Sequence, residues 1–571
     1  MTDAPRPNII LILTDDQGYG DLACTGNPWL ATPCIDALHH AGVRFTDFHA
    51  SPLCTPTRGA LLTGRRPIRN GAWATCWGRS ILRRDELTLP EVLRHNGYHT
   101  ALFGKWHLGD NYPYRPQDRG FEHVVAHKGG GVGQTPDWWG NSYFDDTYWH
   151  NGEPQAHQGY CTDVWFDEAL AYMQAHRAEP FFVYLATNAP HSPYLVEERY
   201  SAPYASNPAI PEPAFYGMIA NIDENVGRLC AWLDEAGLAD NTLLLFMTDN
   251  GSSGGWRPDG RGYNAGMRGI KGSYYDGGHR VPLFIRWPAG GLVGGRDIAD
   301  LTLHLDLLPT LVDLLGLTLP RPAAWDGRSL APLLRGEADA LPDRVHIEQI
   351  RQSTEPPDPC DGVVMTRRWR LVHGAELYDM AQDPAQQHDV AARHPEIAAQ
   401  LRAEQEAWWA EIGPTVERYC PIALGNDAEN PTRLNAMDVL GDVAWHQGHI
   451  LEAQRTTGRW AVDVERPGRY RLELRRWPDE LDLPIDGAPT PEEAALIPYP
   501  HAPVPLRLAP SAAWVGLFGR VWRQAVAPEQ HAVRFELDLP ESGETRLDAW
   551  FVLPGGDEVG AYYVTVERLG P

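Results

Sequence analysis

The sequence predicts an α/β protein in which helices cover a large, mostly parallel sheet, followed by a small α+β subdomain and a C-terminal β-sandwich. Continuous apolar runs alternate with helical patterns in the first part of the chain, which is typical of buried parallel strands. From about residue 420, short strands of alternating polarity are separated by Pro and Gly turns. The 571 residues also exceed what one hydrophobic core usually holds.

Changes in composition along the chain predict three domains. A catalytic α/β domain spans residues 1–340 and ends after a Pro-rich linker at 319–322. An α+β subdomain follows at 341–418, and the β-sandwich occupies 419–571. Two sandwich strands rich in aromatic residues and arginine either contact a sugar or a partner subunit, or fill the core and interface.

Four buried strands are predicted at 8–13, 100–103, 181–186 and 242–247. Each is followed by polar residues that carry chemistry: Asp15 and Asp16, Lys105 and His107, His191, and Asp249 and Asn250. Because ligands gather beyond the carboxyl ends of strands in open α/β sheets, we expect these side chains to meet. Two adjacent acids at a strand end suit a hard cation, although they also suit an ordinary solvated turn.

Helical spacing of apolar residues predicts helices over 215–233 and 305–315. Between them, a glycine-rich loop at 269–272 carries Lys271, and residues 276–285 lead into another strand. The subdomain shows short strand-like runs at 345–347 and 370–372 and a helix through 397–408. Sandwich strands are predicted at four places, namely 460–464, 470–477, 532–537 and 561–566.

The formal charge of −26 argues against binding to nucleic acid or to anionic membranes, which require a basic surface. No apolar run is long enough to span a membrane. The sequence as written begins without an export signal, which favours a cytoplasmic location, or a periplasmic or secreted one if a leader was trimmed. Eight dispersed cysteines without a Cys-x-x-Cys pair favour reduced thiols.

The segment around Cys54 organises the prediction of function. Its sequence is Cys-Thr-Pro-Thr-Arg followed by Gly-Ala-Leu-Leu-Thr-Gly-Arg. Pro56 suits the first turn of a helix, which places position 54 at a helix N-terminus, where N–H groups and the macrodipole favour an anion. Taken alone, this motif also fits a cysteine whose thiol is simply buried in the core and has no chemical role.

Several motifs in order resemble the formylglycine-dependent sulfatases of the alkaline phosphatase superfamily, over residues 1 to about 415. They are Thr-Asp-Asp-x-Gly at 14–18, the Cys54 segment, Gly-Lys-Trp-His-Leu-Gly at 104–109, Pro-His-x-Pro at 190–193, Thr-Asp-Asn-Gly at 248–251, Gly-x-Lys-Gly at 269–272 and Glu-Leu-Tyr-Asp at 376–379. The resemblance implies that the cysteine is converted to formylglycine.

The same resemblance implies one calcium ion, and all its expected ligands offer oxygen. These ligands are Asp15, Asp16, the modified residue at Cys54, Asp249 and Asn250.

The remaining roles also follow from the resemblance and the residue types. Lys105 and Lys271 would bind the sulfate oxygens, and Arg58 would brace the nucleophile and the acids. His107 would act as base and His191 as acid, while Asp249 would orient the nucleophile. We expect His279 and Arg280 to contact the substrate.

These features predict hydrolysis of a sulfate monoester through a formylglycine hydrate and a covalent sulfo-enzyme intermediate. The sequence does not distinguish aryl sulfates from sulfated saccharides as substrates. The aromatic segments at 73–77 and 136–150 either stack on a sugar or aryl ring of the substrate or belong to the hydrophobic core. The alternatives are a phosphonate monoester or phosphodiester hydrolase of the same superfamily, and an inactive carbohydrate-binding protein. A formylglycine-generating enzyme is the expected partner during maturation. The sequence leaves open whether the protein forms a homo-oligomer.

Overall fold

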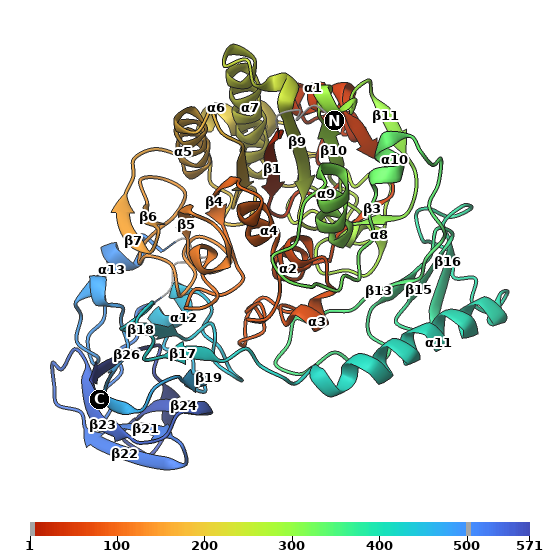
Figure 1. Cartoon of the computed structure of the whole chain (residues 1–571). Coiled ribbons are helices and arrows are strands. Elements are labelled where there is room, and N and C mark those ends of the chain that lie inside the picture. Colours follow the sequence, from red (N-terminus) through yellow and green to blue (C-terminus); the bar gives the residue numbers. More distant parts are fainter. Residues whose placement is uncertain (1–5, 498–503, 571) are drawn as a thin grey trace.

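In the computed structural model, which describes residues 6–497 and 504–570, a ten-stranded mixed sheet forms the centre of the N-terminal part of the chain (Figure 1). Its strand order is β11-β2-β10-β9-β1-β8-β4-β5-β6-β7. The bounds are β1 Asn8–Thr14, β2 Val43–Phe45, β4 His99–Lys105, β5 His123–His127, β6 Thr147–His150, β7 Glu153–Ala156, β8 Phe181–Ala186, β9 Thr242–Thr248, β10 Leu283–Arg286 and β11 Arg296–Ile298.

The middle of this sheet is parallel, as predicted. Strand β1 pairs in parallel with β8 and with β9, so that Leu11 lies between Tyr184 and Leu245. Strands β4 and β5 continue the parallel order, whereas β10 runs antiparallel to β9 and β2. Every residue of β1, β8 and β9 is buried, which explains their continuous apolar sequences.

Helices cover both faces of the sheet because alternate strand residues point to opposite sides. Ile10 and Ile12 pack in one core with helices α1, α5 and α7, and Ile9 and Leu11 pack in another with α2, α4 and α9. The helices of this part are α1 Pro33–Ala41, α2 Cys54–Thr63, α3 Pro67–Asn70, α4 Leu89–His95, α5 Cys161–Ala175, α6 Glu198–Ala205, α7 Pro213–Glu235, α8 Asp276–His279, α9 Leu307–Leu315 and α10 Ala331–Arg335. A short parallel pair is formed by β3 Phe48–His49 and β12 Thr302–Leu303.

A four-stranded antiparallel sheet and one long helix follow the central sheet. The helix is α11, Pro395–Ile412, and its Leu401 and Trp408 pack against Val364 and Leu371 of the sheet. The strands are β13 His346–Glu348, β14 Val363–Met365, β15 Trp369–Val372 and β16 Glu376–Asp379. This arrangement is the α+β subdomain that the sequence predicted.

Two further sheets enclose a separate core in the last part of the chain, at the lower left in Figure 1. One contains β17 Ile422–Leu424, β19 Arg459–Val464, β21 Ala512–Leu517, β22 Arg520–Ala525, β24 Gly543–Val552 and β25 Glu558–Gly560. The other contains β18 Thr432–Asn435, β20 Gly468–Arg475, β23 Val533–Leu539 and β26 Tyr563–Gly570. The short helices are α12 Gln447–Leu451 and α13 Pro491–Ala494. The predicted β-sandwich is therefore present, and we call it the C-terminal domain.

The described part of the chain contains no helix with both the length and the apolar character needed to cross a membrane.

Candidate active site

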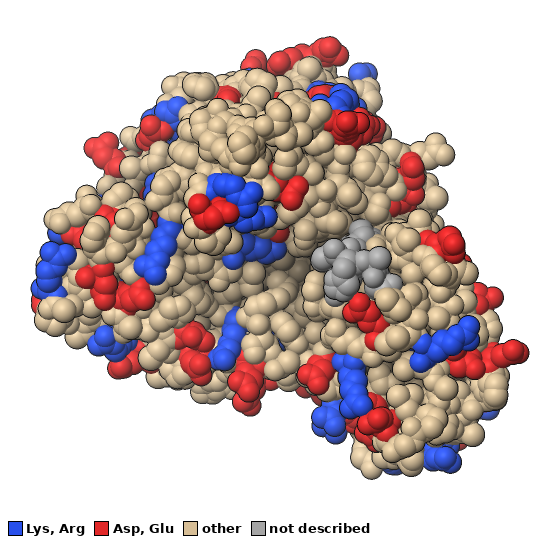
Figure 2. Space-filling view, turned by 180° about the vertical axis from the view of Figure 1, so that it is seen from behind, with Lys and Arg blue, Asp and Glu red and all other residues tan. Residues whose placement is uncertain are grey.

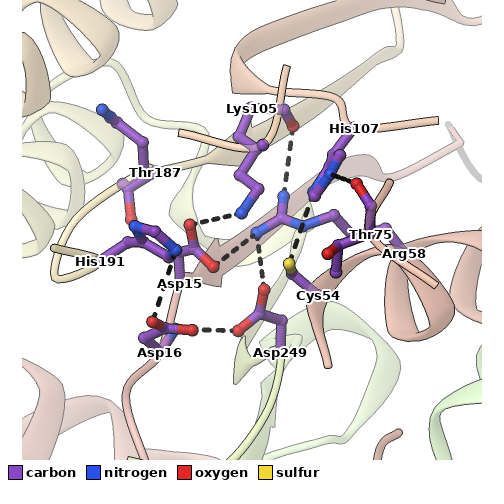
Figure 3. A network of polar contacts seen from close by, with 12 residues as sticks. Asp15, Asp16, Cys54, Arg58, Thr75, Lys105, His107, Thr187, His191 and Asp249 are labelled. Carbon is purple, nitrogen blue, oxygen red and sulfur yellow. Dashed lines mark hydrogen bonds and ion pairs between the residues drawn. The ribbon is translucent and has the colours of Figure 1, made fainter. Parts of the chain in front are cut away.

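The polar residues that follow the central strands meet at one edge of the sheet. Asp15 and Asp16 follow β1, Lys105 ends β4, His191 lies in the loop after β8, and Asp249 follows β9. Parallel pairing of these strands places their carboxyl ends side by side, and helix α2 brings Cys54 to the same place (Figure 3).

Cys54 is the first residue of helix α2, directly after Leu53, which has an extended backbone. Only 2% of the residue is exposed, and its Sγ lies 3.4 Å from Nδ1 of His107. Burial raises the pKa of the Cys54 thiol. The unmodified side chain is therefore held as a neutral thiol, which is a poor nucleophile.

Arg58 lies one helical turn further along α2 and is completely buried. Its Nη2 is 2.9 Å from Oδ2 of Asp249 and 3.7 Å from Oδ1 of Asp15, and its Nη1 donates to the carbonyl of Lys105 at 3.2 Å. In Figure 3 the guanidinium lies between these two carboxylates. One charge therefore holds together the ends of three strands.

Each of the two lysines is paired with an acid. Nζ of Lys105 is 2.7 Å from Oδ2 of Asp15, and Nζ of Lys271 is 2.6 Å from Oδ1 of Asp16. Burial would raise the pKa of Asp16, but the charges of Lys271 and then His191 outweigh it, so that its pKa lies below the usual range. Both lysine ammonium groups therefore form ion pairs with aspartates in this arrangement.

The acids form a cluster suited to a cation. One side-chain ligand atom each from Asp15, Cys54 and Asp249 lies within 4.8 Å of the others. Burial and then the charge of Asp15 raise the pKa of Asp249 to about 7, and a divalent cation would relieve this repulsion.

Two oxygen atoms of this cluster are left without a donor. Among the described residues, Oδ1 of Asp15 and Oδ1 of Asn250 are buried and accept no hydrogen bond, while Nδ2 of Asn250 donates to Asp16 Oδ1 at 3.0 Å. Buried oxygens without donors are what a calcium ion requires as ligands, so the residues present fit the implied ion.

Hydrogen bonds to backbone carbonyls determine the tautomers of both histidines. Nε2 of His107 lies 3.0 Å from the carbonyl of Thr75 and must donate to it, which leaves Nδ1 as an acceptor facing Cys54. Nδ1 of His191 lies 2.7 Å from the carbonyl of Ser192, and its Nε2 is 3.7 Å from Oδ2 of Asp16.

Both histidines are neutral in the resting protein. Burial and then the charge of Lys105 hold the pKa of His107 well below its usual range. Burial also lowers the pKa of His191 to about 4, against the opposing charge of Asp16. A neutral His107 is ready to accept a proton from the group at position 54.

The expectation that His279 contacts substrate is not supported. His279 is fully buried, its Nδ1 lies 2.9 Å from Nδ1 of His49, and its Nε2 lies 3.1 Å from the carbonyl of Tyr274. Burial and then the charge of His49 lower the pKa of His279 to about 3. Sequence adjacency to the Lys271 loop therefore did not bring its side chain to the site.

Arg280 also points elsewhere. Its Nε donates to the carbonyl of Thr46 at 3.0 Å, and its guanidinium lies 5.4 Å from the ring centre of Tyr19. Of the aromatic segments, Trp73, Tyr143 and Tyr148 are at most 1% exposed, so these three belong to the core.

Sequence reasoning missed the backbone that lies against His107 and His191, the two histidines of the candidate site. A Cβ at Gly130 would lie 2.2 Å from Cε1 of His107, and one at Gly131 would lie 3.3 Å from Nδ1 of His191. The three consecutive glycines at 129–131 were the signal, since close backbone approach excludes larger residues. Nothing local in the sequence places this loop beside position 107.

Two family models match the chain. The model described as Sulfatase matches residues 7–317, and the model described as N-sulphoglucosamine sulphohydrolase, C-terminal, matches residues 271–409. The first match alone covers more than half of the chain and contains every residue of the site described above.

Similar proteins agree with the family models. Human N-acetylgalactosamine-6-sulfatase is 33% identical over 359 residues, covering 58% of this chain and 66% of that protein, so about a third of that relative is unmatched. Human arylsulfatase A is 34% identical over 364 residues, covering 58% of this chain and 68% of that protein.

Among solved structures, Ps i-CgsB in complex with k-i-k-neocarrahexaose is 27% identical, with a TM-score of 0.64 over 73% of this chain and 95% of that one. The strand-end cluster, the family models and these relatives lead to one conclusion. The chain belongs to the sulfatase family of the alkaline phosphatase superfamily.

Proposed function

We propose that this protein hydrolyses sulfate monoesters and releases inorganic sulfate. One observation carries the proposal: Sγ of Cys54 lies at a helix N-terminus, 3.4 Å from the accepting Nδ1 of His107 and beside the Asp15 and Asp249 carboxylates. A candidate nucleophile, a base and two carboxylates are thus assembled at a helix N-terminus in one buried place.

The proposed nucleophile is a hydrated formylglycine made from Cys54. Both hydroxyl groups would be attached to the Cβ atom of residue 54, which carries the sulfur atom in the unmodified cysteine. A sulfated thiol could be cleaved only by an attack of water, whereas the second hydroxyl of a hydrated aldehyde can expel sulfate by itself. A formylglycine-generating enzyme would be the maturation partner.

Calcium is the proposed metal, held by oxygens of Asp15, Asp16, Asp249, Asn250 and residue 54. When bound, such an ion supplies Lewis-acid stabilisation of negative charge and lowers the pKa of a neighbouring hydroxyl. The acids would then be neutralised by the ion. Lys105 and Lys271, which pair with two of these acids at 2.7 and 2.6 Å, become available to bind sulfate oxygens.

In the first chemical step, one hydroxyl oxygen at position 54 attacks sulfur, and the bond from sulfur to the alcohol oxygen breaks. Asp249 would take the hydroxyl proton. The negative charge of a bound sulfate ester would favour the protonated form of His191, which would then give a proton to the departing alcohol. Lys105, Lys271 and Arg58 stabilise the charge that develops in the transition state.

The second step releases sulfate without a water attacking sulfur. His107 Nδ1 removes the proton of the remaining hydroxyl, the carbonyl of formylglycine re-forms, and the bond from carbon to the sulfate oxygen breaks. Water then hydrates the aldehyde. The hydrogen bond from His107 Nε2 to Thr75 fixes the tautomer that this step requires.

Mass spectrometry of the peptide containing residue 54 tests the mechanism. We expect the mass change for exchange of a thiol for an aldehyde, in proportion to specific activity. Fully active protein with an unmodified thiol would refute the proposed nucleophile. A higher kcat/KM for an aryl phosphonate monoester than for the matching aryl sulfate would instead favour the phosphonate hydrolase alternative.

The named relatives act on different sulfate esters, so they leave the substrate class open. One solved neighbour was obtained with k-i-k-neocarrahexaose, a saccharide ligand. The site is buried, and the group that leaves must fit its entrance. We therefore place sulfated saccharides first and simple aryl sulfates second.

A further inference from the structure

The loop between β5 and β6 is held against the catalytic histidines from outside the catalytic domain. Its residues Gly130 and Gly131 lie against His107 and His191. The N–H of Thr135 donates to the carbonyl of Trp445 at 3.0 Å, and the N–H of Gln447 donates to the carbonyl of Gly133 at 3.1 Å. The C-terminal domain therefore forms the outer support of the active-site wall.

The side chain of Gln447 completes this support. Its Nε2 donates to the carbonyls of Gln134 at 3.2 Å and Trp138 at 3.1 Å, and its Oε1 accepts from the N–H of Gly140 at 3.0 Å. A β-bridge joins Gln134 to His446. These bonds fix the backbone on both sides of Trp445 relative to the catalytic loop.

Trp445 itself is partly exposed to solvent. It is 38% exposed, whereas Trp460 and Trp477 of the same domain are at most 1% exposed. The rings of His446 and His449 meet its ring edge-on, with centroids 5.5 and 5.0 Å away. A partly exposed tryptophan on a fixed backbone, flanked by imidazoles, offers an apolar face with polar neighbours, which suits a sugar ring.

The exposure of the site residues gives the direction in which a substrate must lie. Cys54 and Lys105 are at most 2% exposed, so the sulfate group lies deepest. The side chain of His191, the proposed acid at the leaving oxygen, is 16% exposed. The leaving group therefore points outward past His191.

That outward path leads toward the 445–449 segment. Gly131 lies against the ring of His191, and Gln134, three residues further along the same loop, forms a β-bridge with His446, the residue after Trp445. Figure 2 shows a hollow in the surface of the molecule, with both basic and acidic side chains around it.

We propose that Trp445, flanked by His446 and His449, is a specificity residue that stacks on a sugar ring of the leaving group, which makes a sulfated oligosaccharide the substrate class. This inference rests on the proposed function. It assigns to the C-terminal domain a direct part in substrate selection.

Kinetics of Trp445→Ala test the inference on the full-length protein, with a panel of sulfated mono- and tetrasaccharides and with nitrophenyl sulfate. For the best tetrasaccharide we expect KM to rise about tenfold with kcat nearly unchanged, as loss of one aromatic contact predicts. Values for nitrophenyl sulfate should stay within about twofold, because that ester lacks the outer ring. Trp445→Phe should keep most of the tetrasaccharide affinity.

Two controls separate the possible failures. Trp514→Ala removes a partly exposed tryptophan from the C-terminal domain, where it stacks on Trp550, and should change neither substrate's KM. Tetrasaccharide binding to a Cys54→Ala protein, measured by calorimetry with and without Trp445→Ala, needs no turnover. If no ester is cleaved but this binding depends on Trp445, the proposed function fails, and only the sugar contact of Trp445 stands. Equal losses for both esters, or binding independent of Trp445, would overturn the inference.

Discussion

Replacing Arg58 by methionine tests the electrostatic logic of the site most directly. At an effective dielectric constant of about 20, its guanidinium attracts Asp249 by about 6 kcal/mol at 2.9 Å and Asp15 by about 4.5 kcal/mol at 3.7 Å. The cost of removing the guanidinium from water offsets several kcal/mol of this attraction. Loss of one partner from a buried pair typically costs about 3 to 5 kcal/mol, which is the decrease in unfolding free energy that we expect.

The decrease should depend on pH. The pKa of Asp249 is already raised to about 7, and loss of Arg58 raises it further. A carboxyl group with a raised pKa favours the folded state below its unfolded value near pH 4 and loses that contribution as the pH rises through the folded pKa. Below about pH 7 both native proteins keep the Asp249 proton, so the deficit of Arg58→Met should stay constant there and grow as the pH rises above about 7.

Urea unfolding of the catalytic domain, followed by tryptophan fluorescence with chelator present, measures both effects. Arg335→Met is the matched control, since Arg335 pairs with Asp313 at 3.2 Å with both side chains more than a third exposed. A surface pair contributes less than about 1 kcal/mol. A deficit for Arg58→Met no larger than that of the control, or one that does not change with pH, would refute the reasoning.

Three further predictions concern metal and chemistry. Calcium at about 100 times its Kd should stabilise the protein by about 2.7 kcal/mol in urea unfolding, and Asp15→Asn should remove this response; equal stabilisation of both proteins would contradict the ligand assignment. His191→Gln should lower kcat for a sugar sulfate by about 10² to 10⁴ but affect nitrophenyl sulfate far less, because a good leaving group needs no acid; equal losses would exclude the acid role. His107→Gln should make the sulfo-enzyme accumulate after a fast first turnover, visible by mass spectrometry as sulfate added at residue 54; no accumulation would exclude the base role.

The central sheet could be predicted because burial on both faces forces continuous apolar strands, as in β1 and β9. Once those strands are parallel, the side chains of Asp15, Lys105 and Asp249 must lie together at one edge of the sheet. The sequence could not show which neighbours of that edge turn inward. His279 is eight residues from Lys271, yet its ring faces His49, because packing of α8 rather than sequence distance decides its direction.

Contacts between distant segments were beyond prediction for a similar reason. The glycines at 129–131 indicated close backbone approach, but their partners His107 and His191 lie outside the segment, and Gln447, which binds Gly133 of the same loop, lies in another domain. The exposed Trp445 has no periodic pattern around it that separates it from the buried tryptophans of its domain. Such positions become informative only when the fold has brought the segments together.

The hydrogen bonds between the 128–141 loop and Gln447 make part of the candidate site depend on the C-terminal domain. A chain shortened to end near residue 418 would leave the carbonyls of Gly133, Gln134 and Trp138 without their N–H donors. The loop that backs His107 would then lose its outer support, although the central sheet would be complete. The outer support of the loop at His107 and His191 therefore comes from residues beyond 409, where the second family-model match ends.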